Sequence, residues 1–109
     1  MVNRHRGEIA AMLDGRQWTL CLTLGALAEL ESAFEATDLN QMTERFASGR
    51  LSANDMITVI GAGLRGAGHT LSNDEVREMQ AEEGAVGYAK IVAELLSATF
   101  GSVDGDQRQ

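Results

Sequence analysis

The residues most suggestive of chemistry form a glycine-rich run in the middle of the chain. Residues 61–66 read Gly-Ala-Gly-Leu-Arg-Gly, which has the G-x-G-x-x-G spacing of a dinucleotide-binding turn. In such a turn the glycines let a pyrophosphate approach the N-terminus of the following helix. The apolar residues 56–60 just before the run could form the buried strand that such a site also needs.

The surroundings of this glycine motif favour a helix instead. Ser52 is a typical N-cap residue. The apolar residues that follow it recur at helical spacing: Met56, Val59, Ile60 and Leu64. After Gly68 the sequence is typical of a loop and a new cap, and no second strand ending in an acidic residue follows. We therefore interpret the glycines as positions that allow close helix packing and then end the helix, and we expect no cofactor.

The residue types of catalytic and metal sites are sparse and scattered. His5, Cys21 and His69 lie far apart, and no pair of them has metal-ligand spacing. Cys21 falls within an apolar, strand-like segment, where a packing role is more common than a reactive thiolate. His69 could act as a general base, but no nucleophile lies in a recognisable signature beside it. The sequence therefore predicts no catalytic residue, no metal site and no enzyme.

Composition and charge narrow the class of protein. The chain has 109 residues, with 16 acidic and 9 basic side chains and a net charge of −7. This length is typical of one domain, and the acidic balance argues against binding to nucleic acid or anionic membranes. No apolar run approaches the ~20 residues of a membrane span, and the N-terminus is too polar for a signal peptide. The expected location is the cytoplasm, which agrees with a single cysteine that cannot form an internal disulfide.

Period-2 patterning predicts a hairpin at the N-terminus. Apolar residues alternate along residues 8–13 and 17–22, on both sides of Asp14-Gly15. An Asp-Gly pair supplies the two positive-φ positions of a type I′ turn, whose twist matches paired strands. We expect one face of this hairpin to pack on helices, because an isolated hairpin is marginally stable in water.

The rest of the chain predicts helices. We expect five segments, which begin after the caps Thr23, Asp38, Ser52 and Ser72 and, for the longest helix, at Gly84. The longest helix should run to Phe100 and end at Gly101. The predicted fold class is α+β and mostly helical, with an N-terminal β-hairpin packed on a bundle of about five helices. Residues 1–101 form the predicted single domain, and residues 102–109 form a polar tail that we expect to be disordered.

The last predicted helix has more apolar circumference than a one-sided surface helix needs. One interpretation makes it the central helix, covered on all sides by the other elements. The other leaves part of it for a partner, since large apolar patches mark interaction sites. On the second interpretation, Tyr88, Val92 and Phe100 border a partner groove, with Arg65 and His69 at a nearby helix end.

Several segments together resemble a known family. They are residues 22–31 (Leu-Thr-Leu-Gly-Ala-Leu-Ala-Glu-Leu-Glu), residues 46–52 (Phe-Ala-Ser-Gly-Arg-Leu-Ser), residues 61–69 with the glycine motif, and the capped segment 71–76. With the hairpin, they are similar to the small tail-assembly chaperones of gene transfer agents and related siphophages. The likeness runs from about residue 4 to residue 101.

This resemblance implies a non-enzymatic protein that acts in assembling a phage-like particle. Its implied partner is the long tail tape-measure protein, alone or together with the tail tube protein, and the family offers no catalytic residues to carry over. Two other functions stay open. One is a small acidic protein–protein adaptor or regulatory domain, and the other is a nucleotide-binding domain that uses Gly61–Gly66.

Overall fold

An antiparallel hairpin opens the fold. The computed structural model describes residues 2–101, so the tail expected at 102–109 lies outside the described residues. After a 3₁₀ turn at Arg4–Arg6, strand β1 (Glu8–Leu13) pairs with β2 (Arg16–Cys21). Asp14 and Gly15 have φ angles of 55° and 76°, as the type I′ turn requires. The predicted hairpin is confirmed.

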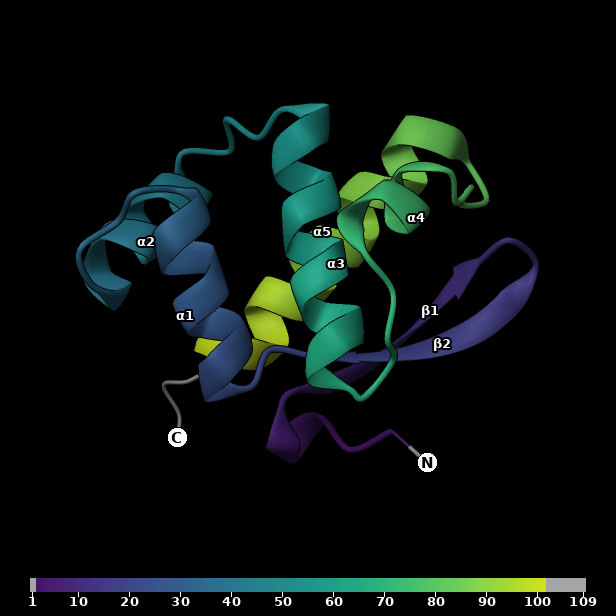
Figure 1. Cartoon of the computed structure of the whole chain (residues 1–109), viewed down its shortest axis with the longest axis horizontal. Coiled ribbons are helices and arrows are strands. Elements are labelled where there is room, and N and C mark those ends of the chain that lie inside the picture. The colour runs from purple at the N-terminus through teal and green to yellow at the C-terminus, as the bar shows by residue number, and fades with distance from the viewer. Residues whose placement is uncertain (1, 102–109) are drawn as a thin grey trace.

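Within the described residues, five helices follow the hairpin, and the predicted fold class is confirmed (Figure 1). They are α1 (Leu24–Ala33), α2 (Leu39–Ala47), α3 (Ala53–Gly66), α4 (Asn73–Arg77) and α5 (Gly84–Phe100). The last helix has the predicted bounds, and Gly101 after it has a φ of 82°. Helix α1 is slightly shorter than the sequence predicts, because the chain turns at Glu35, where φ is 56°.

Four of the helices begin at the predicted caps. In each, the side chain of the cap accepts a hydrogen bond from the backbone N–H three residues later; the caps are Thr23, Asp38, Ser52 and Ser72. Ser52 and Ser72 belong to complete capping boxes. At α2 the capping box is incomplete. Gln41 Oε1 accepts a hydrogen bond from the backbone N–H of Thr37, and not from that of the cap residue Asp38. Local side-chain chemistry thus defines where these helices start.

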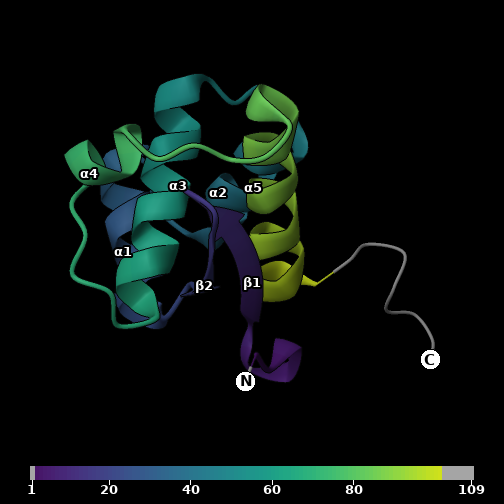
Figure 2. The ribbon, with the colours of Figure 1, turned by 90° about the vertical axis from the view of Figure 1, so that its right-hand side faces the viewer.

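Helix α3, rather than α5, lies at the centre of the domain. It contacts β2, α1, α4 and α5, and its residues 59–64 are all buried. Figure 2 shows α3 between α1 and α5, with the hairpin against the lower part of this layer. Helix α5 buries a narrower stripe, made of Gly87, Ile91, Val92 and Leu95. The interpretation that makes the last helix the central one is therefore wrong. Helix α3 is central, and its small residues let neighbours approach from several sides.

Candidate protein-interaction site

The glycine motif lies inside a helix rather than in a turn before one. Gly61, Gly63 and Gly66 all belong to α3. A Cβ added to Gly66 would overlap the carbonyl oxygen of Cys21, and one added to Gly63 would lie 2.7 Å from a methyl of Leu95. These glycines let β2 and α5 approach the α3 backbone, which is the packing role that the sequence predicts. A phosphate-binding loop would instead present its N–H groups at a helix start.

The cysteine and histidine side chains occupy separate environments. Burial raises the pKa of the Cys21 thiol, and the Glu8 carboxylate raises it further against the opposing effect of Arg6. His69 stands edge-on to Trp18, with ring centroids 5.0 Å apart, and its Nε2 is buried without a hydrogen-bond partner. Within residues 2–101, no three His, Cys, Asp or Glu side chains gather closely enough to hold a metal ion.

Arg65 joins three parts of the fold. Its guanidinium forms an ion pair with Glu29 on α1 at 2.7 Å, and it also donates to the carbonyl of Leu71 at 2.9 Å and to Asn73 Oδ1 at 3.0 Å. The Arg65 side chain is 28% exposed. The donors of the Arg65 guanidinium are therefore largely used within the domain. Two of these hydrogen bonds hold the segment that leads into α4.

The three residues expected on the last helix point to different places. Val92 is 2% exposed and lies in the core, so its side chain does not reach a partner surface. Phe100 lies against Phe46 of α2, with ring centroids 6.4 Å apart. Tyr88 lies 12 residues earlier, about 18 Å away along the helix axis at the helical rise per residue. Together with Arg65 and His69, which line a shallow surface hollow by the loop after α3, these residues do not form one groove.

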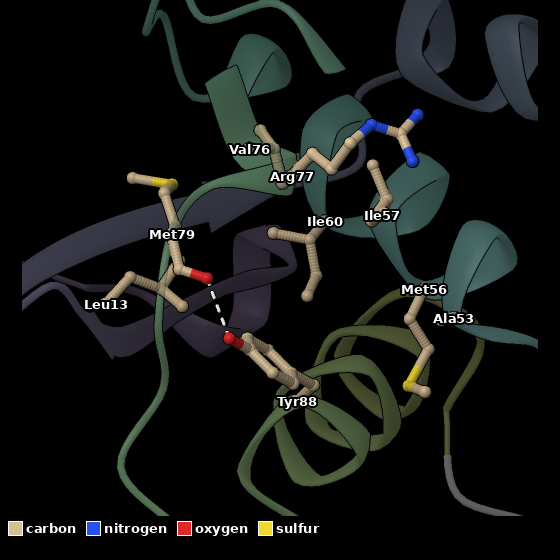
Figure 3. A pocket seen from close by; sticks show the side chains of 9 residues that line it. All are labelled: Leu13, Ala53, Met56, Ile57, Ile60, Val76, Arg77, Met79 and Tyr88. Carbon is tan, nitrogen blue, oxygen red and sulfur yellow. Dashed lines mark hydrogen bonds between the residues drawn. The ribbon is translucent and has the colours of Figure 1, made fainter. Parts of the chain in front are cut away.

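Tyr88 does lie at an apolar cavity of about 180 Å³ (Figure 3). The cavity is formed where β1, α3, α4 and α5 meet, and its lining is almost wholly apolar: Leu13, Ala53, Met56, Ile57, Ile60, Val76, Arg77, Met79 and Tyr88. An engineered apolar cavity of ~150 Å³ accommodates benzene. This cavity therefore has room for about one large apolar side chain.

The cavity has a buried floor and an accessible mouth. Leu13, Ile60 and Val76 are 1–5% exposed and form the floor. Tyr88 and the neighbouring Met56 and Ile57 are partly exposed, and Ala53 is exposed. The Tyr88 hydroxyl donates to the carbonyl of Met79 at 2.7 Å, which ties α5 to the segment after α4 (Figure 3).

Sequence reasoning missed most of this cavity. Of its lining, the sequence predicts only Tyr88 at a partner surface, and it places Met56 on a helix face without indicating a cavity. The available signal was the capping box at Ser72, because it predicts the short helix that supplies Val76 and Arg77 to the cavity. Methionine is common at adaptable binding surfaces, so Met56 and Met79 were a second signal.

The sequence also matches a known family. Residues 6–102 match the family described as phage tail tube protein, GTA-gp10. The chain belongs to this family. The match spans the hairpin and all five helices, and no curated protein and no solved structure matches the chain.

Membership of the GTA-gp10 family confirms the expectation that this chain is a tail-related protein of phages or gene transfer agents. The family description names a tail tube protein, so it supports a structural protein rather than an enzyme, and contacts with other tail proteins. It does not name an assembly chaperone. None of the helices within residues 2–101 is long and apolar enough to cross a membrane.

Proposed function

We propose that this GTA-gp10 family member is a non-enzymatic assembly chaperone that binds the tail tape-measure protein while the tail tube forms around it. The observation that carries the proposal is the apolar cavity lined by Met56, Met79 and Tyr88. A long helical protein awaiting its tube exposes apolar faces, and an apolar recess between helices can cover part of such a face. The cytoplasm, where tails assemble, is the proposed location.

The family description favours a second function, that of a subunit of the tube wall. A wall subunit in stacked rings contacts neighbours on both sides and in the rings above and below. At about 800 Å² for each of these four faces, such contacts would cover roughly 3,200 Å². The accessible surface of this chain is 6523 Å², so about half of it would have to be interface.

The exposed apolar residues do not provide such faces. Within residues 2–101, the exposed large apolar side chains are Met12, Leu24, Leu39 and Val86. They lie on four different elements, namely β1, α1, α2 and α5. Permanent interfaces have contiguous apolar centres, and copies that each carry a net charge of −7 repel one another. These properties support a factor that binds during assembly over a wall subunit.

Co-expression with a tail tape-measure protein from the same genome tests the proposal. We expect the two proteins to purify together and the fraction of tape-measure protein in the supernatant to rise several-fold over expression alone. The matched control is the same tape-measure protein with an unrelated acidic domain of equal size, which should leave it in the pellet. The proposal fails if this chain neither purifies with the tape-measure protein nor raises its yield in the supernatant.

A further inference from the structure

The outer edge of the hairpin, on the side of β1 away from β2, presents backbone groups for pairing. Within residues 2–101 the sheet has two strands, so β1 pairs with β2 on one side only. We infer that the middle of this outer edge, at Ala10 and Met12, binds an extended segment of another protein in which apolar and basic residues alternate. The inference goes beyond the proposed function, because neither residue lines the apolar cavity.

Two hydrogen bonds show which residues of β1 face outward. The N–H of Glu8 donates to the carbonyl of Asn3 at 3.1 Å. The N–H of Asp14 donates to the carbonyl of Gln80 at 2.8 Å. Neither acceptor belongs to β2, so both bonds lie on the outer edge. Backbone groups that point to one edge recur at every second residue of an antiparallel strand. The even-numbered residues between Glu8 and Asp14 therefore also present their N–H and C=O groups outward.

This edge is open in the middle and closed at both ends. Asn3 closes one end, and the isolated antiparallel bridge between Leu13 and Ala81 closes the other. Between them, in the part of the chain that the structure describes, the backbone of Ala10 or Met12 forms no backbone hydrogen bond outside the hairpin. The bridge shows that a third strand can pair here. Neither open residue is a Lys or a Pro, the residue types that often block an edge strand.

An open hollow of about 350 Å³ lies beside the open residues. Helix α5 forms its other wall, and Figure 2 shows α5 beside β1 on the side away from β2. The inner side of the hollow is apolar, because it is lined by Ala11, Gly87 and Ile91, which are all buried. An extended segment paired with β1 would turn alternate side chains toward this inner side. Small or apolar residues fit there.

The exposed part of the lining is acidic. Its four charged side chains are Glu82, Glu83, Lys90 and Glu94. Lys90 and Glu83 form an ion pair at 2.9 Å, so the lining keeps a net charge of −2. Lys or Arg at the remaining alternate positions of the bound segment would meet complementary charge. The edge and the hollow together therefore indicate a segment with apolar and basic residues in alternation.

A second copy of this chain fits the edge less well. Two copies that pair through the same edge place identical surfaces opposite each other. The acidic linings of both hollows would then face each other, and each chain carries a net charge of −7. Like charges brought together in this way oppose association. We therefore assign the edge to a segment of a different protein.

A heteronuclear NMR titration with a synthetic peptide tests this inference. The probe is a peptide of about eight residues, within the usual length of a strand, in which Val and Lys alternate. We expect the amide signals of Ala10 and Met12 to move downfield and their hydrogen exchange to slow several-fold at saturating peptide. The amides of Gln17 and Thr19, which face the other edge of the hairpin, should change far less. A control peptide that alternates Val with Glu should bind at least tenfold more weakly.

N-methylation of the peptide tests the pairing geometry without altering the protein. A peptide residue that exchanges hydrogen bonds with Ala10 or Met12 lies directly opposite it, on the same face of the sheet. Lys occupies these positions when Val faces the inner side of the hollow. Methylating the backbone nitrogens of the Lys residues should therefore weaken binding at least tenfold. Methylating those of the Val residues should have a much smaller effect, since their N–H groups point away from β1.

A proline in β1 provides the matching test on the protein. Ala10→Pro removes an outward N–H group, and proline is tolerated at such positions of an edge strand. Gln17→Pro makes the same change at an exposed position on the other edge of the hairpin. We expect Ala10→Pro to weaken peptide binding several-fold and Gln17→Pro to leave it unchanged. If either proline lowers the melting temperature markedly, the N-methylated peptides decide the question on the wild-type chain.

The outcomes bear separately on the edge and on the chaperone function. The inference is wrong if the signals that move lie away from Ala10 and Met12, or if methylating Lys and Val nitrogens has the same effect. It is also wrong if these two amides gain protection with rising protein concentration and no peptide, because a second copy then occupies the edge. Each of these results leaves the co-expression test of the chaperone function untouched. If co-expression fails while the peptide binds as expected, the edge assignment stands and the proposed function fails.

Discussion

Substituting alanine for Gly66 should destabilise the domain, because this glycine lets β2 meet the central helix. The Cβ of an alanine at position 66 would overlap the carbonyl oxygen of Cys21 and lie 3.3 Å from the backbone nitrogen of Thr23. Both atoms belong to the backbone, so no rotamer change relieves the overlap. The strand must move away from α3, whose buried face packs on it.

The magnitude follows from two opposing effects. Overpacking in a close contact costs about 1–3 kcal/mol, and a contact with backbone belongs at the upper end of that range. Alanine gains up to ~1 kcal/mol over glycine through helix propensity. The net loss at Gly66 is therefore about 2 kcal/mol. At about 4–8 °C per kcal/mol for a domain of nearly this size, the melting temperature should fall by roughly 8–16 °C.

Thermal denaturation followed by circular dichroism measures this change. The matched control is Gly25→Ala on α1, where an added Cβ would have its nearest contact at 3.9 Å, with Thr23 Oγ1. This control should melt at or slightly above the parent, because it gains helix propensity without a clash. The packing interpretation of the glycine motif is refuted if Gly66→Ala melts as high as the Gly25 variant.

The remaining predictions concern three other features. Tyr88→Phe leaves the Met79 carbonyl without its donor, so we expect a loss of about 1–2 kcal/mol in unfolding free energy, measured by urea denaturation; an unchanged midpoint would contradict this. Because the pKa of Cys21 is raised, less thiolate exists at a given pH. Iodoacetamide should therefore react more slowly with Cys21 than with glutathione at about pH 8, and Glu8→Gln should speed the reaction. NAD and ATP should leave the melting temperature of the wild-type protein unchanged, and a clear upward shift with either would restore the nucleotide-binding alternative.

Features encoded by neighbouring residues could be predicted from the sequence. The turn at Asp14-Gly15 and the caps at Ser52 and Ser72 depend on side chains within three residues of the backbone groups that they satisfy. These local patterns predict the hairpin and the starts of the helices without knowledge of the tertiary structure.

Features that depend on distant segments could not be predicted in this way. The cavity combines residues from Leu13 to Tyr88 on four elements, and no periodicity within one helix reveals that they meet. The partner of Arg65 in its ion pair, Glu29, lies 36 residues away in the sequence. The sequence predicts that apolar residues cover much of the circumference of α5. Only the tertiary packing shows that Val92, on this apolar surface, belongs to the core.

The copy number of this chain in purified particles tests the central claim most directly, since an assembly chaperone and a wall subunit differ most in abundance. Quantitative mass spectrometry against labelled standards would give copies of this chain per tape-measure protein. We expect a number far below that of the repeating tube component, with most of this chain found in tape-measure complexes outside finished particles. A copy number equal to that of the repeating component of the tube would contradict it and assign this chain to the tube wall.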